Sequence, residues 1–169
     1  MKNTIFLLGL ITLVLFGCRK EDNPTPTPIS PAEIYANRLV GIWDVDNLTY
    51  SASVTVLGQT IPISGSAPQA GYIEFKKTPS RIVDYDIKFK PSLPAGIPLP
   101  LDTVRLLGRG SWVNTVDTIT LTEDSSNMVY KFKVLYNSAN TQQLKTVVNY
   151  NAGILGEVPV TLEMTLGRR

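Results

Sequence analysis

The sequence predicts an all-β domain, an up-and-down antiparallel β-barrel of about eight strands with a short N-terminal helix. Two observations lead to this prediction. Apolar and polar residues alternate with the two-residue period of a strand through most of the chain after residue 40. The runs are short and of similar length, which suits a barrel that closes on itself and leaves no exposed edge. Alternation alone also fits a β-sandwich, which is the second choice.

The composition limits the chemistry of the domain. Of 169 residues, 43% are apolar and 18% are charged, which is enough for one domain with a buried core. The chain has no histidine and one cysteine, Cys18, which excludes His or Cys zinc sites, Ser-His-Asp and Cys-His nucleophiles, and disulfides. A net charge of +2 does not indicate a basic surface of the kind that binds nucleic acid. We therefore predict no enzyme activity, metal, cofactor or nucleic-acid partner.

The chain begins with a segment typical of export. An uncharged, mostly apolar run over residues 5–17 follows Lys2, and a charged stretch comes directly after Cys18. The run is shorter than the roughly 20 apolar residues that a transmembrane helix needs. Residues 1–17 are therefore predicted to be a signal peptide that is removed.

The residues around Cys18 indicate a lipid anchor. Leu15-Phe16-Gly17-Cys18 resembles the bacterial lipobox, and Lys20-Glu21-Asp22 resembles the export signal of surface lipoproteins in the Bacteroides and Flavobacterium group. The likeness implies acyl chains on Cys18, and two or three such chains hold a protein firmly to a membrane. It also implies a place in the cell envelope, at the outer membrane and exposed on the cell surface.

A tether and a helix are expected between the anchor and the first strand. Alternating prolines over residues 23–28 favour an extended chain, so residues 18–29 are predicted to space the domain, residues 30–169, from the membrane. Ser30, Pro31 and Glu33 follow the capping-box pattern, with Glu33 placed to reach back to the cap. The helix should run to about Leu39.

The alternating runs and the turn residues between them place the strands. Gly58 suits a tight turn, which predicts a hairpin between the run ending at Val56 and residues 60–64. Residues 91–100 contain four prolines and are predicted to be a connection. The expected strands cover residues 40–56, 60–64, 70–77, 83–89, 102–107, 111–122, 128–136, 143–150 and 158–166.

The order of a short helix, Gly41-Ile42-Trp43 and a long first strand resembles the lipocalin signature at the closed end of that family's barrel. In the family an arginine from the end of the last strand packs across the tryptophan. Arg168 is the matching candidate and Arg169 the second, so Trp43 and Arg168 are the expected barrel-closing pair. With the lipobox, the tether and a second Gly-x-Trp at Trp112, the chain resembles the lipocalin-like (calycin-type) lipoproteins of the Bacteroides group.

In the first strand the apolar residues switch from odd-numbered to even-numbered positions, and a regular strand cannot bury both sets. Trp43 and Val45 share one face by parity, whereas Leu48 and the alternate residues after it share the other. A bulge near residues 46–47 would bury both sets.

Aromatic residues are the candidates for a binding site. Six of them fall on expected inward faces, where they either line an apolar cavity or simply fill the barrel. These are Tyr50, Tyr85, Phe89, Tyr130, Phe132 and Tyr136. Two carboxylate pairs, Asp84 with Asp86 and Asp44 with Asp46, are interpreted as solvated charge rather than as a glycosidase or calcium site.

Two functions therefore remain open. The first is a non-enzymatic envelope barrel that binds a small apolar or amphipathic ligand. The second is a barrel with a solid core whose loops bind a protein or a glycan, as an accessory subunit or an inhibitor. Cavity volume discriminates between them, because a ligand site needs several hundred cubic ångströms.

Overall fold

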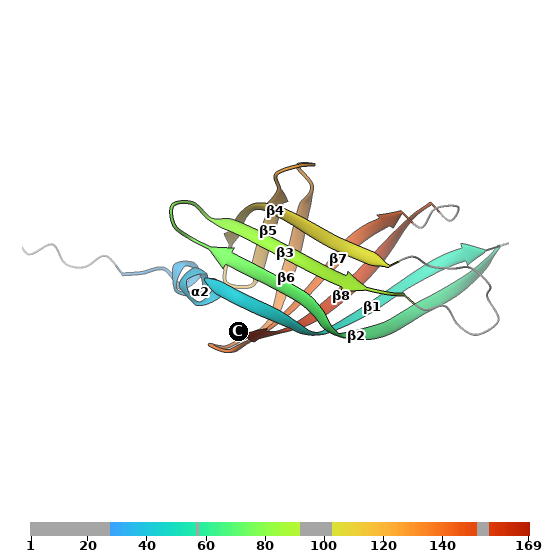
Figure 1. Ribbon diagram of the computed structural model, residues 1–169, viewed down its shortest axis with the longest axis horizontal. Coiled ribbons are helices and arrows are strands. Elements are labelled where there is room, and N and C mark those ends of the chain that lie inside the picture. Colours follow the sequence, from blue (N-terminus) through green and yellow to red (C-terminus); the bar gives the residue numbers. More distant parts are fainter. Residues whose placement is uncertain (1–27, 57, 92–102, 152–155) are drawn as a thin grey trace, which may run out of the picture.

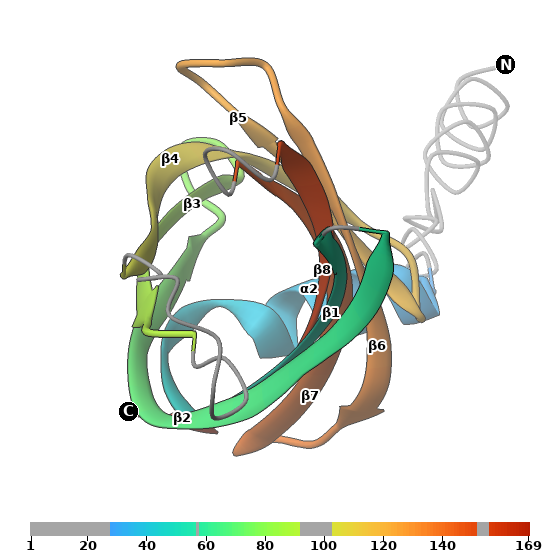
Figure 2. The same ribbon diagram turned by 90° about the vertical axis from the view of Figure 1, so that its right-hand side faces the viewer.

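The computed structural model describes residues 28–56, 58–91, 103–151 and 156–169, so Cys18 and the predicted signal and export motifs lie outside the described residues. Each strand pairs antiparallel with the next, and the last pairs with the first, which closes the barrel (Figures 1 and 2). The predicted up-and-down barrel is confirmed, and the sandwich is not formed. The elements are α2 (Pro31–Leu39), β1 (Gly41–Val56), β2 (Gln59–Lys76), β3 (Ile82–Phe89), β4 (Val104–Asn114), β5 (Thr118–Glu123), β6 (Val129–Asn137), β7 (Thr141–Asn151) and β8 (Glu157–Arg168).

Helix α2 covers one end of the barrel, which we call the closed end (Figure 1). Ser30 is the N-cap and its hydroxyl accepts a hydrogen bond from the backbone N–H of Glu33 at 3.2 Å, as the capping pattern predicted. The carboxylate of Glu33 does not reach back to the cap. It binds Lys77 and Arg81 instead, because the turn between β2 and β3 brings two cations to the first turn of the helix.

The boundaries predicted for four strands were wrong. The runs at residues 60–64 and 70–77 form one strand, β2, which continues past Pro68 through a bulge where Gln69 has φ +51°. The run at residues 102–107 continues into the first part of the run at residues 111–122 as β4, and the remainder of that second run forms β5. The hydroxyl of Thr115 donates to the carboxylate of Asp117 at 2.6 Å, and this side-chain turn breaks the run.

The predicted bulge in β1 is confirmed. Its pairing with both neighbours shifts between Val45 and Asn47. Asp46 is the extra residue against β8, whereas against β2 the extra residue lies on β2, between Pro68 and Gly71. Trp43 and Val45 before the bulge and Leu48 after it are all completely buried. The bulge therefore lets one strand contribute both sets of apolar residues to the core.

The strands lose neighbours toward the end opposite α2, which we call the mouth. β1 pairs with β8 only as far as Ser51, and β2 pairs with β3 only from Gly71 onward. β4 pairs with β5 only from Gly110. The outer parts of β1–β2, β3–β4 and β7–β8 therefore stand as three separate two-stranded arms around the mouth (Figures 1 and 2).

Candidate ligand-binding site in the barrel

The closed end is sealed by the pair that the resemblance implied. Trp43 is fully buried, and its indole N–H donates to the carbonyl of Leu39 at 2.7 Å. The guanidinium carbon of Arg168 lies 5.1 Å from the centroid of the indole ring. Its nitrogens donate to the carbonyls of Arg38 at 2.9 Å and Val40 at 2.6 Å. Arg168 thus joins the end of β8 to the end of α2 as well as covering the ring.

A second tryptophan, Trp112 of β4, is held in the same way near the closed end. Trp112 donates to the carbonyl of Lys76 at 2.9 Å, and the guanidinium of Arg81 lies 5.0 Å from its ring. Phe75 meets the ring edge-on with centroids 5.4 Å apart. The sequence showed the second Gly-x-Trp motif, but Arg81 lies in a turn and carried no signal of this role.

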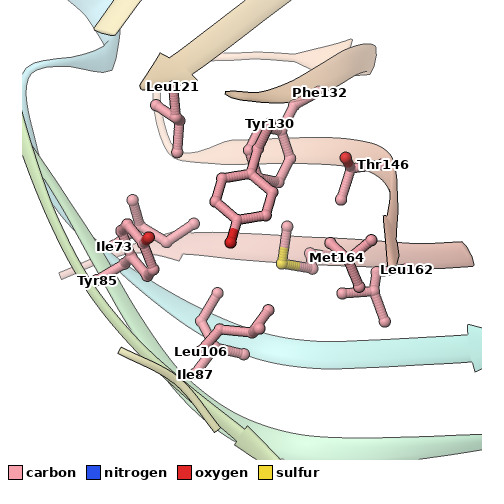
Figure 3. A pocket seen from close by; sticks show the side chains of 11 residues that line it. Ile73, Tyr85, Ile87, Leu106, Leu121, Tyr130, Phe132, Thr146, Leu162 and Met164 are labelled. Carbon is pink, nitrogen blue, oxygen red and sulfur yellow. The ribbon is translucent and has the colours of Figure 1, made fainter. Parts of the chain in front are cut away.

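The centre of the barrel contains a small cavity of about 20 Å³ (Figure 3). Three of the six predicted aromatics meet there, Tyr85 from β3 and Tyr130 and Phe132 from β6. The other lining side chains are apolar apart from one threonine: Ile73, Ile87, Leu106, Leu121, Thr146, Val148, Leu162 and Met164. The volume suffices for one water-sized group and not for a whole ligand.

The mouth contains a second apolar pocket, of about 30 Å³. Tyr50 and Phe89 stack in it with ring centroids 5.2 Å apart. All three arms contribute side chains: Tyr50, Ala52, Val54 and Ile63 from β1–β2, Phe89, Pro91 and Val104 at β3–β4, and Tyr150, Val158 and Val160 from β7–β8. The sequence identified two of these aromatics but not Tyr150, whose run it did place as a strand.

The prediction for Tyr136 was wrong. Its side chain is 51% exposed and lies outside the barrel. The pairing of β6 with β7 shifts between Val134 and Tyr136, so the strand has a bulge there and the alternation inverts. Asn137 rather than Tyr136 then lies opposite the buried Gln142.

Of the four carboxylates in the two predicted pairs, Asp44, Asp84 and Asp86 form surface ion pairs. Arg105 binds Asp86 through two hydrogen bonds, at 3.0 and 2.9 Å, and this contact holds the pKa of Asp86 below its usual value. Asp84 lies 2.8 Å from Lys76, and Arg169 binds Asp44 and lowers its pKa. Within the described ranges no three carboxylate, His or Cys side chains gather as a metal site.

Glu123 was not among the predicted site residues, but it accepts a hydrogen bond from Tyr85, which lines the interior cavity. The hydroxyl of Tyr85 donates to Glu123 at 3.4 Å, at the end of β5. Burial, and then the charge of Glu123, raises the pKa of Tyr85, and the same two causes raise the pKa of Tyr130. The three residues lie on different strands, so only the barrel's register brings them together.

Comparison with known proteins gives few likenesses. No family model matches the chain, and no curated protein matches it. One similar solved structure is described as EF1p2_mFAP2b bound to DFHBI, with 19% identity, a TM-score of 0.43, and coverage of 79% of this chain and 96% of that one. Another is the S-type phycobiliprotein lyase CPES from Guillardia theta, with 10% identity, a TM-score of 0.42, and coverage of 81% and 92%. No helix in the described ranges is long and apolar enough to cross a membrane.

Proposed function

We propose that this protein is a non-enzymatic lipoprotein of the cell envelope that takes a small apolar or amphipathic molecule into the mouth of its barrel. One observation carries the binding role, namely the apolar pocket to which three separate arms contribute. Ordinary ligand pockets are concave and mostly apolar, as this one is. The surface ion pairs of Asp44, Asp84 and Asp86 support a role without catalysis.

The pocket must enlarge to hold a ligand, since ligand sites occupy roughly 300 to 1,000 Å³. The arrangement of the arms lowers the free energy needed to enlarge the pocket. β1 beyond Ser51 is not paired to β8, β2 before Gly71 is not paired to β3, and β4 before Gly110 is not paired to β5. Moving an arm outward therefore breaks no ladder hydrogen bond between arms. The main cost is exposure of apolar surface, which a bound apolar molecule would offset.

The binding role is tested with the neutral dye N-phenylnaphthylamine and the full chain in lipid nanodiscs, with the signal of protein-free nanodiscs subtracted. Ala52 lines the pocket, so Ala52→Trp should fill it and weaken dye binding at least about tenfold. Val147→Trp is the matched control, because Val147 is 58% exposed on the outside of β7. Equal binding by both variants and the wild type would place the dye elsewhere and overturn the proposal.

The anchor is tested separately through Cys18. Cys18→Ser should release the protein from the membrane fraction or leave it uncleaved, because no sulfur remains to carry the acyl group. Acylation by mass spectrometry and membrane fractionation are the measurements. Membrane retention with unchanged acylation would contradict the lipoprotein role and leave the binding role standing.

A solid-core interaction module is the second candidate, and the small cavity volumes of about 20 and 30 Å³ favour it. The two candidates differ in their response to filling the mouth. In a module, Ala52→Trp should leave capture of a protein or glycan intact, and no apolar probe should bind the wild type.

A further inference from the structure

The barrel wall at the end of β5 holds a carboxylate that faces hydroxyl groups. Glu123 accepts one hydrogen bond from Tyr85 and another, on its second oxygen, from Ser126. Gly108 makes this arrangement possible. A Cβ at that position would lie 2.5 Å from the Tyr85 hydroxyl oxygen and 2.7 Å from Glu123 Oε1, so a side chain there would push the two groups apart.

The carboxylate of Glu123 has no cationic partner in the described part of the chain, where no lysine or arginine nitrogen lies within 4.0 Å of it. This distinguishes it from Asp84 and Asp86 on the outer face, each of which has two. A partly buried carboxylate bound only by neutral donors is well placed to accept a charge-assisted hydrogen bond.

Glu123 is not in the lining of the interior cavity, but its hydrogen-bond partner Tyr85 is, and the cavity has the volume of a small cation. The cavity of about 20 Å³ is bordered by the phenol rings of Tyr85 and Tyr130, and Figure 3 shows the hydroxyl of Tyr130 pointing into it. Aromatic faces attract ammonium groups, and an ammonium is about the size of a water molecule. The remaining lining is almost wholly apolar, which suits an alkyl chain.

The interior cavity and the mouth pocket follow one another along the same strands. Ile87 lines the cavity and Phe89, two residues on, lines the pocket. The same step occurs on β4 from Leu106 to Val104 and on β8 from Leu162 to Val160. An apolar column therefore leads from the phenols to the mouth.

We infer that the ligand is a primary alkylamine, with its ammonium group at Glu123, Tyr85 and Tyr130 and its alkyl chain toward the mouth. The inference rests on the proposed function and names the ligand class. A carboxylate at the inner end of the column disfavours fatty acids, because two like charges would face one another.

The test compares octylamine, octanol and octanoate, which share a chain and differ in the head group, as competitors of N-phenylnaphthylamine on the full chain in nanodiscs. Octylamine should bind at least about tenfold more tightly than octanol, with octanoate weakest. Glu123→Gln should remove the preference for the amine and leave octanol binding unchanged. Glu157→Gln, an exposed carboxylate at the start of β8, is the control that removes the same charge and keeps the preference.

Gly108→Ala provides a second variant if Glu123→Gln unfolds, and it should reduce the amine preference by separating the carboxylate from the phenol. Equal binding of octylamine and octanol to the wild type, or a preference that survives in a folded Glu123→Gln or Gly108→Ala protein, would overturn the assignment while leaving the binding barrel intact. Failure of all three competitors to bind would overturn the proposed function as well.

Discussion

The two ends of the barrel use their apolar residues differently. At the closed end, Trp43 and Trp112 are almost completely buried, each indole N–H has a carbonyl partner, and an arginine lies against each ring. At the mouth, an aromatic stack is surrounded by small aliphatic side chains from arms that are not paired to one another. The hydrogen bonds and cation–π contacts of the tryptophans thus tie strands and helix together at the closed end, whereas no strand pairing holds the arms to one another at the mouth.

The largest expected effect is at the closed end. Trp43→Ala should lower the free energy of unfolding by about 3 to 5 kcal/mol. It leaves a cavity beneath α2, and the strands around it cannot move inward to fill it because they are paired to their neighbours at this end of the barrel. Urea denaturation measures the loss. A loss below about 1 kcal/mol would show that the closed end is not the more stable half. The free energy of unfolding of Trp43→Phe should lie between those of Trp43→Ala and the wild type.

Truncation at the mouth should cost less for a comparable side chain. Phe89→Ala removes one partner of the stack with Tyr50, but the arms can move inward and fill part of the space. We expect a loss of about 2 kcal/mol, at the low end for an aromatic deletion. The comparison would be broken by a loss equal to that of Trp43→Ala in the same denaturation experiment.

Mutation of the two C-terminal arginines should cost different amounts of stability, because their surroundings differ. Arg168→Ala removes a cation–π contact and hydrogen bonds to the end of α2, and should cost about 1 to 2 kcal/mol. Arg169→Ala removes a surface ion pair with Asp44 and should cost less than about 0.5 kcal/mol. Thermal unfolding of both variants checks the order, and a reversed order would reassign the closing role to Arg169.

The smallest effect concerns acid. Arg105 lowers the pKa of Asp86 in the folded protein, so the ion pair stabilises the fold above the ordinary aspartate pKa, and this contribution is lost as the pH falls through the lowered folded value. Asp86→Asn should therefore slightly reduce the dependence of the melting temperature on pH between about pH 2 and 5. Asp124→Asn, an exposed site in the turn after β5, serves as control, and the same slope in both variants would contradict the assignment.

The sequence allowed the closed end to be predicted in more detail than the mouth. The Ser30 cap, the bulge at Asp46 and the contact between Trp43 and Arg168 follow from local patterns, parity and a short motif. The bulge that turns Tyr136 outward could not be predicted, because the alternation of residues 128–136 continues through it without a break.

The contact between Glu123 and Tyr85 could not be predicted from any local pattern in the sequence. Glu123, Gly108 and Tyr85 are neighbours only because the strand registers align them across the barrel wall. The clash that a Cβ at residue 108 would cause is likewise a property of the assembled barrel. Arg81 is a similar case, since its contact with Trp112 joins a turn to a strand 31 positions along the chain, the difference between the two residue numbers.

The position of α2 sets the direction in which an anchored molecule would face. The chain enters the domain beside this helix, at the end of the barrel opposite the mouth (Figure 1). A proline-rich tether over residues 18–29, extended at about 3.1 Å per residue, would span roughly 37 Å between Cys18 and that end. If Cys18 is acylated as proposed, the mouth is at the end of the barrel farther from the point where the tether joins the domain, where it would be open to the surrounding medium.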